Sequence, residues 1–307
     1  MTEHPLPGAL VSSSWLAAHL GEPGLVVVDG SWYLPAAGRD PRAEYRAGHI
    51  PGAVFWDLDE LSDRSTALPH MLALPDELAR QIAALGIGDG DRVVAYDGSG
   101  TNLSAPRIWW TLRVADHQAA AVLDGGIGRW RAEARPLEAG EVRRPSARFT
   151  ARFESAWVRS EPDLLATLKS GAAQLLDARS RGRFQGIEAE PRPGLRGGHI
   201  PGAKNLPFNE LVGPDGTMLP REEIRLRYAA AGVDLGRPVI CSCGSGVTAC
   251  ALALGLEVLG HREHAVYDGS WAEWGRVGGP RIERGQGLGV RGQGSGEAPP
   301  SPLTPDP

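Results

Sequence analysis

The hexapeptide Gly-His-Ile-Pro-Gly-Ala occurs at residues 48–53 and again, unchanged, at residues 198–203. Six identical residues at two distant places do not plausibly arise by chance, so they indicate a duplicated unit. Apolar runs that end in aspartate, at residues 25–29 and 175–177, precede the two hexapeptides. Later segments of the chain align in the same way. We therefore expect two copies of one structural unit.

Between the apolar runs, the sequence carries patterns typical of helices, as at residues 75–85, 161–170 and 221–231. Short β-type runs that alternate with helices imply a mainly parallel sheet flanked by helices. The predicted fold class is therefore α/β, with two tandem domains of this kind. In such folds, ligands bind where the carboxyl ends of the strands run into loops.

The predicted domain boundaries follow from the repeat and from composition. We assign residues 1–140 to an N-terminal domain and residues 158–280 to a C-terminal domain. Residues 141–157 are the predicted linker, because the chain around them is rich in Arg, Glu, Gly and Pro and lacks clear periodicity. Residues 281–307 consist mainly of Gly, Arg, Gln, Ser and Pro, which predicts a disordered tail.

The overall composition is that of an ordinary globular protein. The chain has 307 residues, a formal net charge of -5 and a pI near 5.9, which give no electrostatic reason to expect nucleic acid or an anionic membrane as a partner. No apolar run approaches the length of a membrane span and the N-terminus lacks a signal-peptide pattern, so we expect a cytoplasmic protein. Three cysteines, all within residues 241–250, argue against a structural disulfide framework. The oligomeric state leaves no mark in the sequence.

A cysteine-containing loop follows one of the predicted strands. Two apolar residues, 239–240, run into a glycine-broken segment at residues 243–248, and an Ala/Leu-rich stretch follows at 249–259. This pattern predicts a strand, a loop and a helix. A thiol just before a helix meets unpaired backbone N–H groups and the positive end of the helix dipole, which stabilise a thiolate. In the first copy Asp97 aligns with Cys243, so only the second copy has a thiol.

The tandem hexapeptides, the Cys-Gly-Ser-Gly-Val-Thr loop at residues 243–248 and the Asp-Gly-Ser-Trp segment at 268–271 resemble the rhodanese-type sulfurtransferases. The resemblance covers about residues 10–275 and implies two rhodanese-like domains, of which the first lacks the catalytic cysteine. The thiosulfate branch of this family carries Cys-Arg-Lys-Gly-Val-Thr, whereas the 3-mercaptopyruvate branch carries the loop present in this chain. Thiosulfate is a dianion that gains from basic loop residues, while a ketoacid monoanion needs one carboxylate clamp.

The resemblance also implies the residues that bind and attack the substrate. Cys243 is the expected nucleophile. Arg183 and Arg192 match the substrate-binding arginines of the family, which hold the carboxylate and polarise the neighbouring ketone. The expected substrate-binding residues of the cysteine loop are Gly244, Gly246, Val247 and Thr248.

Residues of the first copy are expected to contribute to the same site. Asp59 and His70 match positions that the family places across the domain cleft, near Ser245. A carboxylate, an imidazole and a hydroxyl can form a proton relay to the substrate. The competing interpretation is that Asp59 caps a helix and His70 fills a surface turn. His49 and His199 belong to the repeated hexapeptide, which favours a structural role because the copy without a thiol has it too.

The implied reaction is a sulfur transfer in two steps. The Cys243 thiolate attacks the sulfur of 3-mercaptopyruvate, and pyruvate leaves as an enolate that the two arginines and the Ser245 hydroxyl stabilise and protonate. A thiophilic acceptor, such as cyanide, a small thiol or reduced thioredoxin, then removes the outer sulfur of the cysteine persulfide. This chemistry needs no metal and no organic cofactor.

Several alternatives compete with this interpretation. A cysteine phosphatase would need an arginine six residues after the nucleophile, where this chain has Ala249. Zinc bound by Cys241, Cys243 and Cys250 would need a Cys-x-Cys spacing that resembles no standard structural site. Within the family, the alternatives are a thiosulfate sulfurtransferase and a sulfur carrier or binding module that serves a partner.

Overall fold

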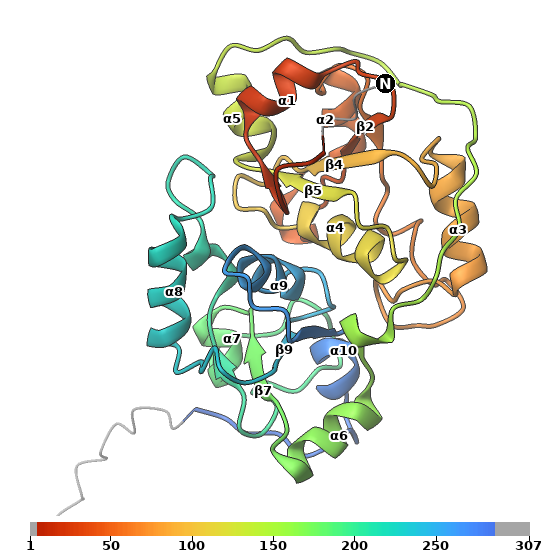
Figure 1. Cartoon of the computed structure of the whole chain (residues 1–307). Coiled ribbons are helices and arrows are strands. Elements are labelled where there is room, and N and C mark those ends of the chain that lie inside the picture. Colours follow the sequence, from red (N-terminus) through yellow and green to blue (C-terminus); the bar gives the residue numbers. More distant parts are fainter. Residues whose placement is uncertain (1–4, 286–307) are drawn as a thin grey trace, which may run out of the picture.

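The computed structural model describes residues 5–285, which form two domains stacked one on the other (Figure 1). Each domain contains a five-stranded sheet whose neighbouring strands all pair in parallel. The strands of the first sheet are β1 (Leu10–Val11), β2 (Leu25–Asp29), β3 (Val54–Phe55), β4 (Arg92–Tyr96) and β5 (Ala120–Leu123). Those of the second sheet are β6 (Val158–Arg159), β7 (Gln174–Asp177), β8 (Lys204–Asn205), β9 (Val239–Ser242) and β10 (His264–Tyr267).

The two sheets have the same strand order. It is β1-β5-β4-β2-β3 in the first domain and β6-β10-β9-β7-β8 in the second, so every strand has a counterpart at the same place in the other sheet. This correspondence confirms the predicted α/β fold with two tandem copies. The central strands are β4 and β9, and Asp97 and Cys243 directly follow them. The aligned aspartate and cysteine therefore occupy equivalent positions at the carboxyl ends of the two sheets.

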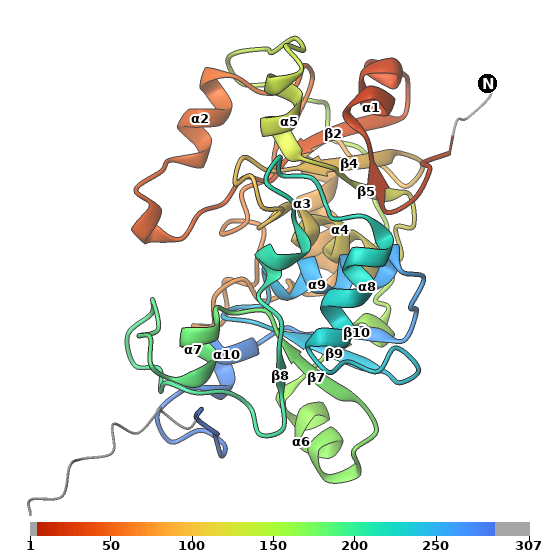
Figure 2. The same cartoon turned by 90° about the vertical axis from the view of Figure 1, so that its left-hand side faces the viewer.

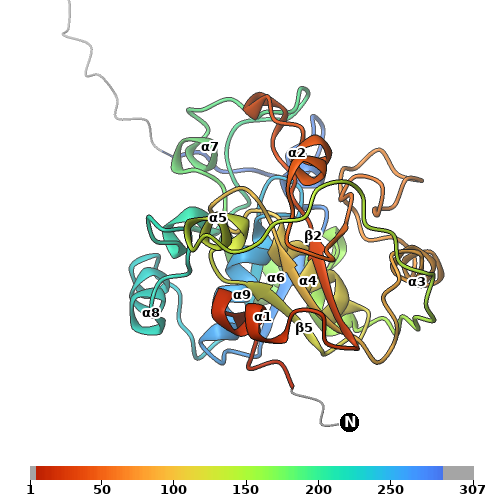
Figure 3. The ribbon, with the colours of Figure 1, turned by 90° about the horizontal axis from the view of Figure 1, so that it is seen from above.

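Helices surround both sheets and fill the space between them (Figures 1, 2 and 3). Those of the first domain are α1 (Ser13–His19), α2 (Pro41–Ala47), α3 (Pro75–Ala84), α4 (Ala105–Val114) and α5 (Gly126–Ala132). Those of the second are α6 (Glu161–Ser170), α7 (Arg181–Gln185), α8 (Arg221–Ala230), α9 (Ala249–Val258) and α10 (Ser270–Trp274). Short 3-10 turns are η1 (Pro35–Ala37), η2 (Ser155–Trp157) and η3 (Phe208–Leu211).

The local sequence explains where the predicted helices begin and end. The helix predicted at residues 161–170 is α6, with the expected bounds. Ser160 and Asp163 form a reciprocal capping box at its start, and Gly171 ends it in the left-handed conformation that glycine adopts freely. The other two predicted helices, α3 and α8, each end one residue earlier than expected.

Helices α4 and α9 pack against each other where the two domains meet (Figure 1). Helix α9 is apolar over most of its surface and buried from Ala249 to Leu256. A helix of this kind is stable only when it is covered on all sides. The second sheet covers one side of α9 and α4 covers another, so one continuous core contains residues of both domains. The second domain is therefore completed by the first.

The predicted linker is attached to the first domain. Ala147 donates a backbone hydrogen bond to Ala83, Glu154 donates one to Val114, and the side chain of Phe149 is buried. In Figure 1 this segment runs down alongside α3 before it enters the second domain. The connection is thus an extended strap held by backbone hydrogen bonds along one domain.

The start of the predicted tail is held by the second domain. His199 and Glu283 exchange two backbone hydrogen bonds, and the indole of Trp274 donates to the Arg281 carbonyl. Residues 281–285 are therefore paired with the hexapeptide region instead of being free, a difference from the prediction. The rest of the predicted disordered tail, residues 286–307, lies outside the described residues. Within residues 5–285, the helices are all too short or too polar to span a membrane.

Candidate active site

Cys243 directly follows β9, at the carboxyl end of the second sheet, and is almost fully buried. The Cys243 N–H donates to the Ser270 hydroxyl at 3.1 Å. The carbonyls of Cys243 and Gly244 accept hydrogen bonds from the backbone N–H groups of Trp271 and Ala272, at 3.0 and 2.8 Å. Hydrogen bonds to the first turn of α10 therefore fix the backbone of the cysteine loop.

The backbone N–H groups that follow Cys243 differ from that of Cys243, because they lack acceptors within the described chain. Among residues 5–285, no acceptor receives a hydrogen bond from the backbone N–H groups of residues 244–248. Unpaired amides at the start of a helix are a ready-made site for an anion. The backbone N–H groups between Cys243 and α9, which we call the amide cradle, are therefore available to an anion.

The equivalent loop of the first domain is closed by its own side chain. One carboxylate oxygen of Asp97 accepts hydrogen bonds from the Ser104 and Ala105 N–H groups, both at 2.9 Å. The other oxygen accepts from the Ser99 N–H at 2.8 Å and from its hydroxyl. The aspartate thus supplies internally the negative charge that the second loop leaves to a thiolate or ligand.

Side chains of the first domain reach the cysteine loop. His70 lies 2.9 Å from the Ser245 hydroxyl through Nδ1 and 2.8 Å from the Asp59 carboxylate through Nε2. Trp32 donates its indole N–H to the other Asp59 oxygen at 3.1 Å and meets the His70 ring edge-on. The structure therefore brings together Asp59, His70 and Ser245, from opposite sides of the domain boundary. The competing expectation, a helix cap and a surface turn, does not describe this geometry.

The charge states of this chain of groups follow from its surroundings. Burial is the largest influence on His70 and lowers its pKa, although the neighbouring Asp59 carboxylate acts in the opposite direction. The hydrogen bond from His70 lowers the pKa of Asp59. Because an ionised carboxylate can only accept, Nε2 of a neutral His70 carries the proton, and Nδ1 accepts from the Ser245 hydroxyl. The imidazole is then oriented to take a proton from Ser245.

The two predicted substrate arginines differ in their partners. Arg183 is held by the buried carboxylate of Glu190, at 2.6 Å. Arg192 has neither a hydrogen bond nor an ion pair with any residue of the described chain. Burial lowers the pKa of Arg192, and the charge of Cys243 acts on it in the opposite direction, so this guanidinium lies within electrostatic reach of the thiol. Arg192 is thus a free cation beside Cys243.

The remaining predicted loop residues shape the space around the thiol. A side chain at Gly244 would place its Cβ 2.9 Å from a guanidinium nitrogen of Arg183. Gly246 has a φ of +74°, and its Cβ would lie 2.7 Å from the Asp268 carbonyl. Val247 is buried, and Thr248 immediately precedes α9. The two glycines are therefore needed for close approach, one to Arg183 and one to the α10 turn.

Several residues of the site were not found from the sequence. Glu190 is the most informative, because its two carboxylate oxygens bind Arg179 and Arg183 at 2.7 and 2.6 Å. Arg179 also pairs with Asp177 and lies over the Trp271 ring. Glu190 stands two residues before Arg192, and this spacing was the only signal for it in the sequence. Trp32 carried no comparable signal, and Ser270 entered only as part of the Asp-Gly-Ser-Trp segment.

The other two cysteines and the two hexapeptide histidines have surroundings that indicate a structural role. Burial raises the pKa values of the Cys241 and Cys250 thiols. His49 binds the Tyr45 carbonyl and stacks on the Tyr45 ring, and His199 does the same with Phe184. Within the described range, His, Cys, Asp and Glu side chains form no group of three or more that could hold a metal ion.

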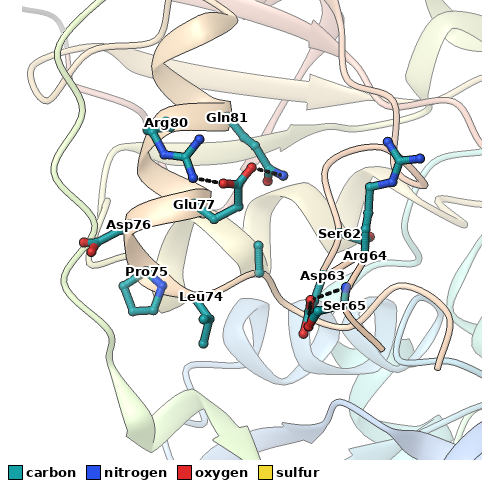
Figure 4. A pocket seen from close by; sticks show the side chains of 11 residues that line it. Ser62, Asp63, Arg64, Ser65, Leu74, Pro75, Asp76, Glu77, Arg80 and Gln81 are labelled. Atoms are coloured by element: carbon teal, nitrogen blue, oxygen red, sulfur yellow. Dashed lines mark hydrogen bonds and ion pairs between the residues drawn. The ribbon is translucent and has the colours of Figure 1, made fainter. Parts of the chain in front are cut away.

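A separate cavity of about 620 Å³ opens between residues 62–65 and the first turns of α3 (Figure 4). Charged and polar side chains line much of it, among them the ion pair of Glu77 and Arg80. Residues 62–65 belong to the same loop as Asp59 and His70, but none of the predicted site residues lines the cavity. The cavity is therefore not the thiol site.

Comparison with known proteins identifies the family to which this fold belongs. The family model of the rhodanese-like domain matches residues 12–133 and again residues 160–276. The chain therefore belongs to the rhodanese family, with two domains of that family in tandem.

Similar proteins of this family carry sulfurtransferase names. The chain is 42% identical to human 3-mercaptopyruvate sulfurtransferase, over 89% of this chain and 94% of the human protein. It is also 42% identical to thiosulfate/3-mercaptopyruvate sulfurtransferase 1 of Arabidopsis thaliana, over 86% and 75% of the two chains. The crystal structure of SseA from Escherichia coli, described with 3-mercaptopyruvate sulfotransferases, matches with a TM-score of 0.79 and 38% identity, over 86% and 99%.

Proposed function

We propose that the protein is a sulfurtransferase that moves the sulfur of 3-mercaptopyruvate, through a Cys243 persulfide, to a thiophilic acceptor and releases pyruvate. The relatives named above support the reaction class. The observation that carries the assignment is the meeting of four groups at one place. These groups are the thiol of Cys243, its open amide cradle, the Asp59–His70–Ser245 chain and the unpaired Arg192.

In the first step, the substrate carboxylate binds Arg192, and the fixed guanidinium of Arg183 lies against the loop to polarise the ketone. The Cys243 thiolate attacks the substrate sulfur, so an S–S bond forms and the C–S bond breaks. The electron pair of that bond remains on pyruvate as an enolate. The substrate thiol loses its proton to the Ser245–His70 pair, which returns a proton to the enolate carbon. The products are pyruvate and a Cys243 persulfide anion.

In the second step, the outer sulfur leaves the enzyme. A nucleophilic acceptor, such as cyanide or a thiolate, attacks the terminal sulfur, and the Cys243 thiolate departs with the electrons of the S–S bond. The open N–H groups of residues 244–248 stabilise the negative charge of both the persulfide and the thiolate. No electrons are gained or lost overall, so the cycle closes without an added oxidant or reductant.

The charge of the loop favours 3-mercaptopyruvate over thiosulfate. Gly244 and Ser245 carry no charge, and Arg183 is already paired with Glu190. Of the two predicted substrate arginines, Arg192 is the one without a partner among the described residues, and its single charge suits one carboxylate better than a dianion. Thiosulfate is the second donor to test, because a relative named for both donors aligns over most of this chain.

The decisive experiment measures steady-state turnover with each donor on one enzyme preparation. We expect 3-mercaptopyruvate to give the higher kcat/KM with cyanide or a small thiol as acceptor, and Cys243→Ser to abolish transfer from both donors. Transfer that survives in Cys243→Ser would overturn the persulfide mechanism. A higher kcat/KM for thiosulfate would reverse the choice of donor. Poor turnover with every small acceptor would favour a dedicated sulfur carrier.

Several finer points remain predictions. We propose that the first domain supplies site residues without thiol chemistry of its own, within the division 1–140, 141–157 and 158–280. A cytoplasmic location and thioredoxin as the acceptor also stay predictions from the sequence. The donor and the acceptor are small molecules in this proposal, and neither nucleic acid nor a membrane is a partner.

A further inference from the structure

The backbone of His70 is held in a conformation that histidine rarely adopts. Its φ is +61°, in the left-handed region. When the starts of α3 and α8 are aligned, the equivalent residue of the second copy is Gly216, with a φ of +80°. Glycine adopts this conformation freely, whereas a residue with a side chain does so at a cost in free energy. The first copy therefore places an imidazole where the other copy has glycine.

Such a conformation persists only where surrounding groups hold it. The Arg107 guanidinium donates a hydrogen bond to the His70 carbonyl at 2.5 Å. Asp268 of the second domain accepts one from the Leu72 N–H at 2.8 Å. Arg107 and Asp268 also pair with each other at 2.7 Å, and their side chains are only 2% and 5% exposed. One buried ion pair across the domain boundary therefore fixes the backbone at His70 and at Leu72, two residues further on.

The same guanidinium also holds the cysteine loop. Its Nη1 donates to the Gly246 carbonyl at 3.1 Å, next to Ser245 in the chain. A Cβ at Gly246 would lie 2.9 Å from that nitrogen, so the loop approaches the arginine as closely as glycine allows. The guanidinium is itself stacked over the Trp110 ring, 4.4 Å from its centre. Arg107 thus contacts the segments that carry both partners of the His70–Ser245 hydrogen bond.

The mirror position in the repeat lacks this arginine. Asp124, the counterpart of Asp268, accepts a hydrogen bond from the Met218 N–H at 2.7 Å, as Asp268 does from Leu72. When the ends of α4 and α9 are aligned, Ala251 stands where the first copy has Arg107. If the guanidinium served only to join the two domains, we would expect an arginine at both of these equivalent positions. An arginine occurs only at the one that contacts the thiol loop.

We propose that Arg107, held by Asp268, is the positioning residue that sets His70 against Ser245 for sulfur transfer. The inference rests on the proposed function, because it requires that the relay takes part in the reaction. Arg107 does not touch the substrate in this scheme and acts through the two segments that it holds. The free-energy cost of burying the guanidinium is offset by the ion pair and by the carbonyls that accept its N–H groups.

The test is a double-mutant cycle on the full-length protein. Lysine keeps the positive charge of Arg107. It lacks the planar guanidinium, however, so it cannot donate to the two carbonyls and to Asp268 at the same time. We expect Arg107→Lys to lower kcat with 3-mercaptopyruvate about tenfold to a hundredfold, with little change in KM because Arg192 is untouched. In a His70→Ala background, the same change should alter kcat by no more than about twofold, because no imidazole remains to be positioned.

Asp268→Asn repeats the test should Arg107→Lys fail to fold, because asparagine still accepts from Leu72 but loses the ion pair. The matched control is Asp124→Asn at the mirror position, which should lower the thermal midpoint but leave kcat unchanged.

Each result decides the inference. If the effects of Arg107→Lys and His70→Ala multiply, Arg107 acts independently of the imidazole and the inference is wrong. A loss of kcat in Asp124→Asn as large as in Asp268→Asn would also overturn it, because any domain contact would then suffice. If the single variant His70→Ala kept the kcat of the unaltered protein, the relay would play no part in the reaction. That result would contradict the proposed mechanism, and it is seen in the single variant without reference to Arg107.

Discussion

His70 is a residue of the first domain whose side chain reaches Ser245 in the second. Burial lowers the pKa of its imidazole below the ordinary value of 6.5, and Asp59 opposes this shift. The neutral form, which is able to accept a proton from Ser245, is therefore present through neutral pH and is lost as the pH falls through this lowered pKa. The local sequence Pro-His-Met indicated none of this, because both the burial and the partners come from other segments.

This charge state predicts an asymmetric pH profile. We expect kcat/KM for 3-mercaptopyruvate to stay level from about pH 8 to below the ordinary histidine value and to fall at more acid pH. In Asp59→Asn, the carboxylate that raises the His70 pKa is gone, so the acid limb should move to still lower pH. Steady-state profiles of both proteins check this. An acid limb with its midpoint above pH 6.5 would contradict the assignment.

Arg192 is the residue expected to determine donor affinity. Its guanidinium has no partner within the described chain, so the substrate carboxylate would be its first. A charge-assisted hydrogen bond contributes about 1.5–3 kcal/mol, so Arg192→Gln should raise KM for 3-mercaptopyruvate about tenfold to a hundredfold. The control, Arg181→Gln, removes an arginine that is exposed and paired with Glu210, and the KM of this variant should match that of the unaltered protein. Equal KM values for both variants would exclude the carboxylate clamp.

At the scale of elements, the two strand–loop–helix units after β4 and β9 show what the duplication changed. Both loops precede a helix at the carboxyl end of a central strand, where backbone N–H groups have no acceptor within the helix. In the first unit the Asp97 carboxylate accepts from these groups. In the second unit they remain open beside Cys243. The first loop is thus stabilised by its own charge, while the second is free for chemistry.

Because the Asp97 carboxylate accepts hydrogen bonds only within the first loop of the described chain, its removal should change the stability of the protein and not its activity. Asp97→Ala leaves backbone N–H groups without their acceptor, so the free energy of unfolding should fall by about 2–3 kcal/mol. The kcat per folded molecule should not change, because Asp97 lies in the other domain's loop. Denaturant unfolding and steady-state kinetics measure the two quantities. Asp97→Asn, which keeps one acceptor oxygen, should lose less stability than Asp97→Ala.

At the scale of the whole molecule, the two domains share one hydrophobic core, and side chains of both domains meet at the candidate active site. Helix α9 would expose an apolar face if α4 were removed, and the imidazole would lose Ser245. The strap between the domains is itself bonded along the first domain. The protein is therefore built as one cooperative structure, although its fold consists of two copies.

This dependence predicts a single unfolding transition. Buried tryptophans lie in both domains, so their fluorescence reports on both. We expect fluorescence, circular dichroism and enzymatic activity to share one denaturant midpoint, because neither domain keeps its core without the other. Activity that disappears well before the fluorescence change would show that the domains separate first.

The sequence by itself determined the fold class, the duplication and the position of the thiol. The repeated hexapeptide and the alternation of apolar runs with helical patterns carry that information locally, because strand and helix periodicity and glycine turns are properties of short segments. The position of Cys243 between a strand and a helix is local in the same sense. The resemblance to the family added Asp59, His70 and the two arginines as expectations. The structure joins Asp59 and His70 to Ser245 by hydrogen bonds and sets Arg183 against Gly244.

Only the tertiary structure decided how these groups work together. Glu190 holds Arg183, Trp32 holds Asp59, and Arg107 holds the segments of His70 and Ser245. Apart from the Glu190–Arg183 pair, which spans seven residues, these contacts join residues that are distant in the chain or lie in different domains. A buried charge needs a partner, and no local sequence pattern specifies which residue that partner is. Residues 281–285 show the same limit, because their polar composition predicted disorder whereas backbone pairing with His199 holds them.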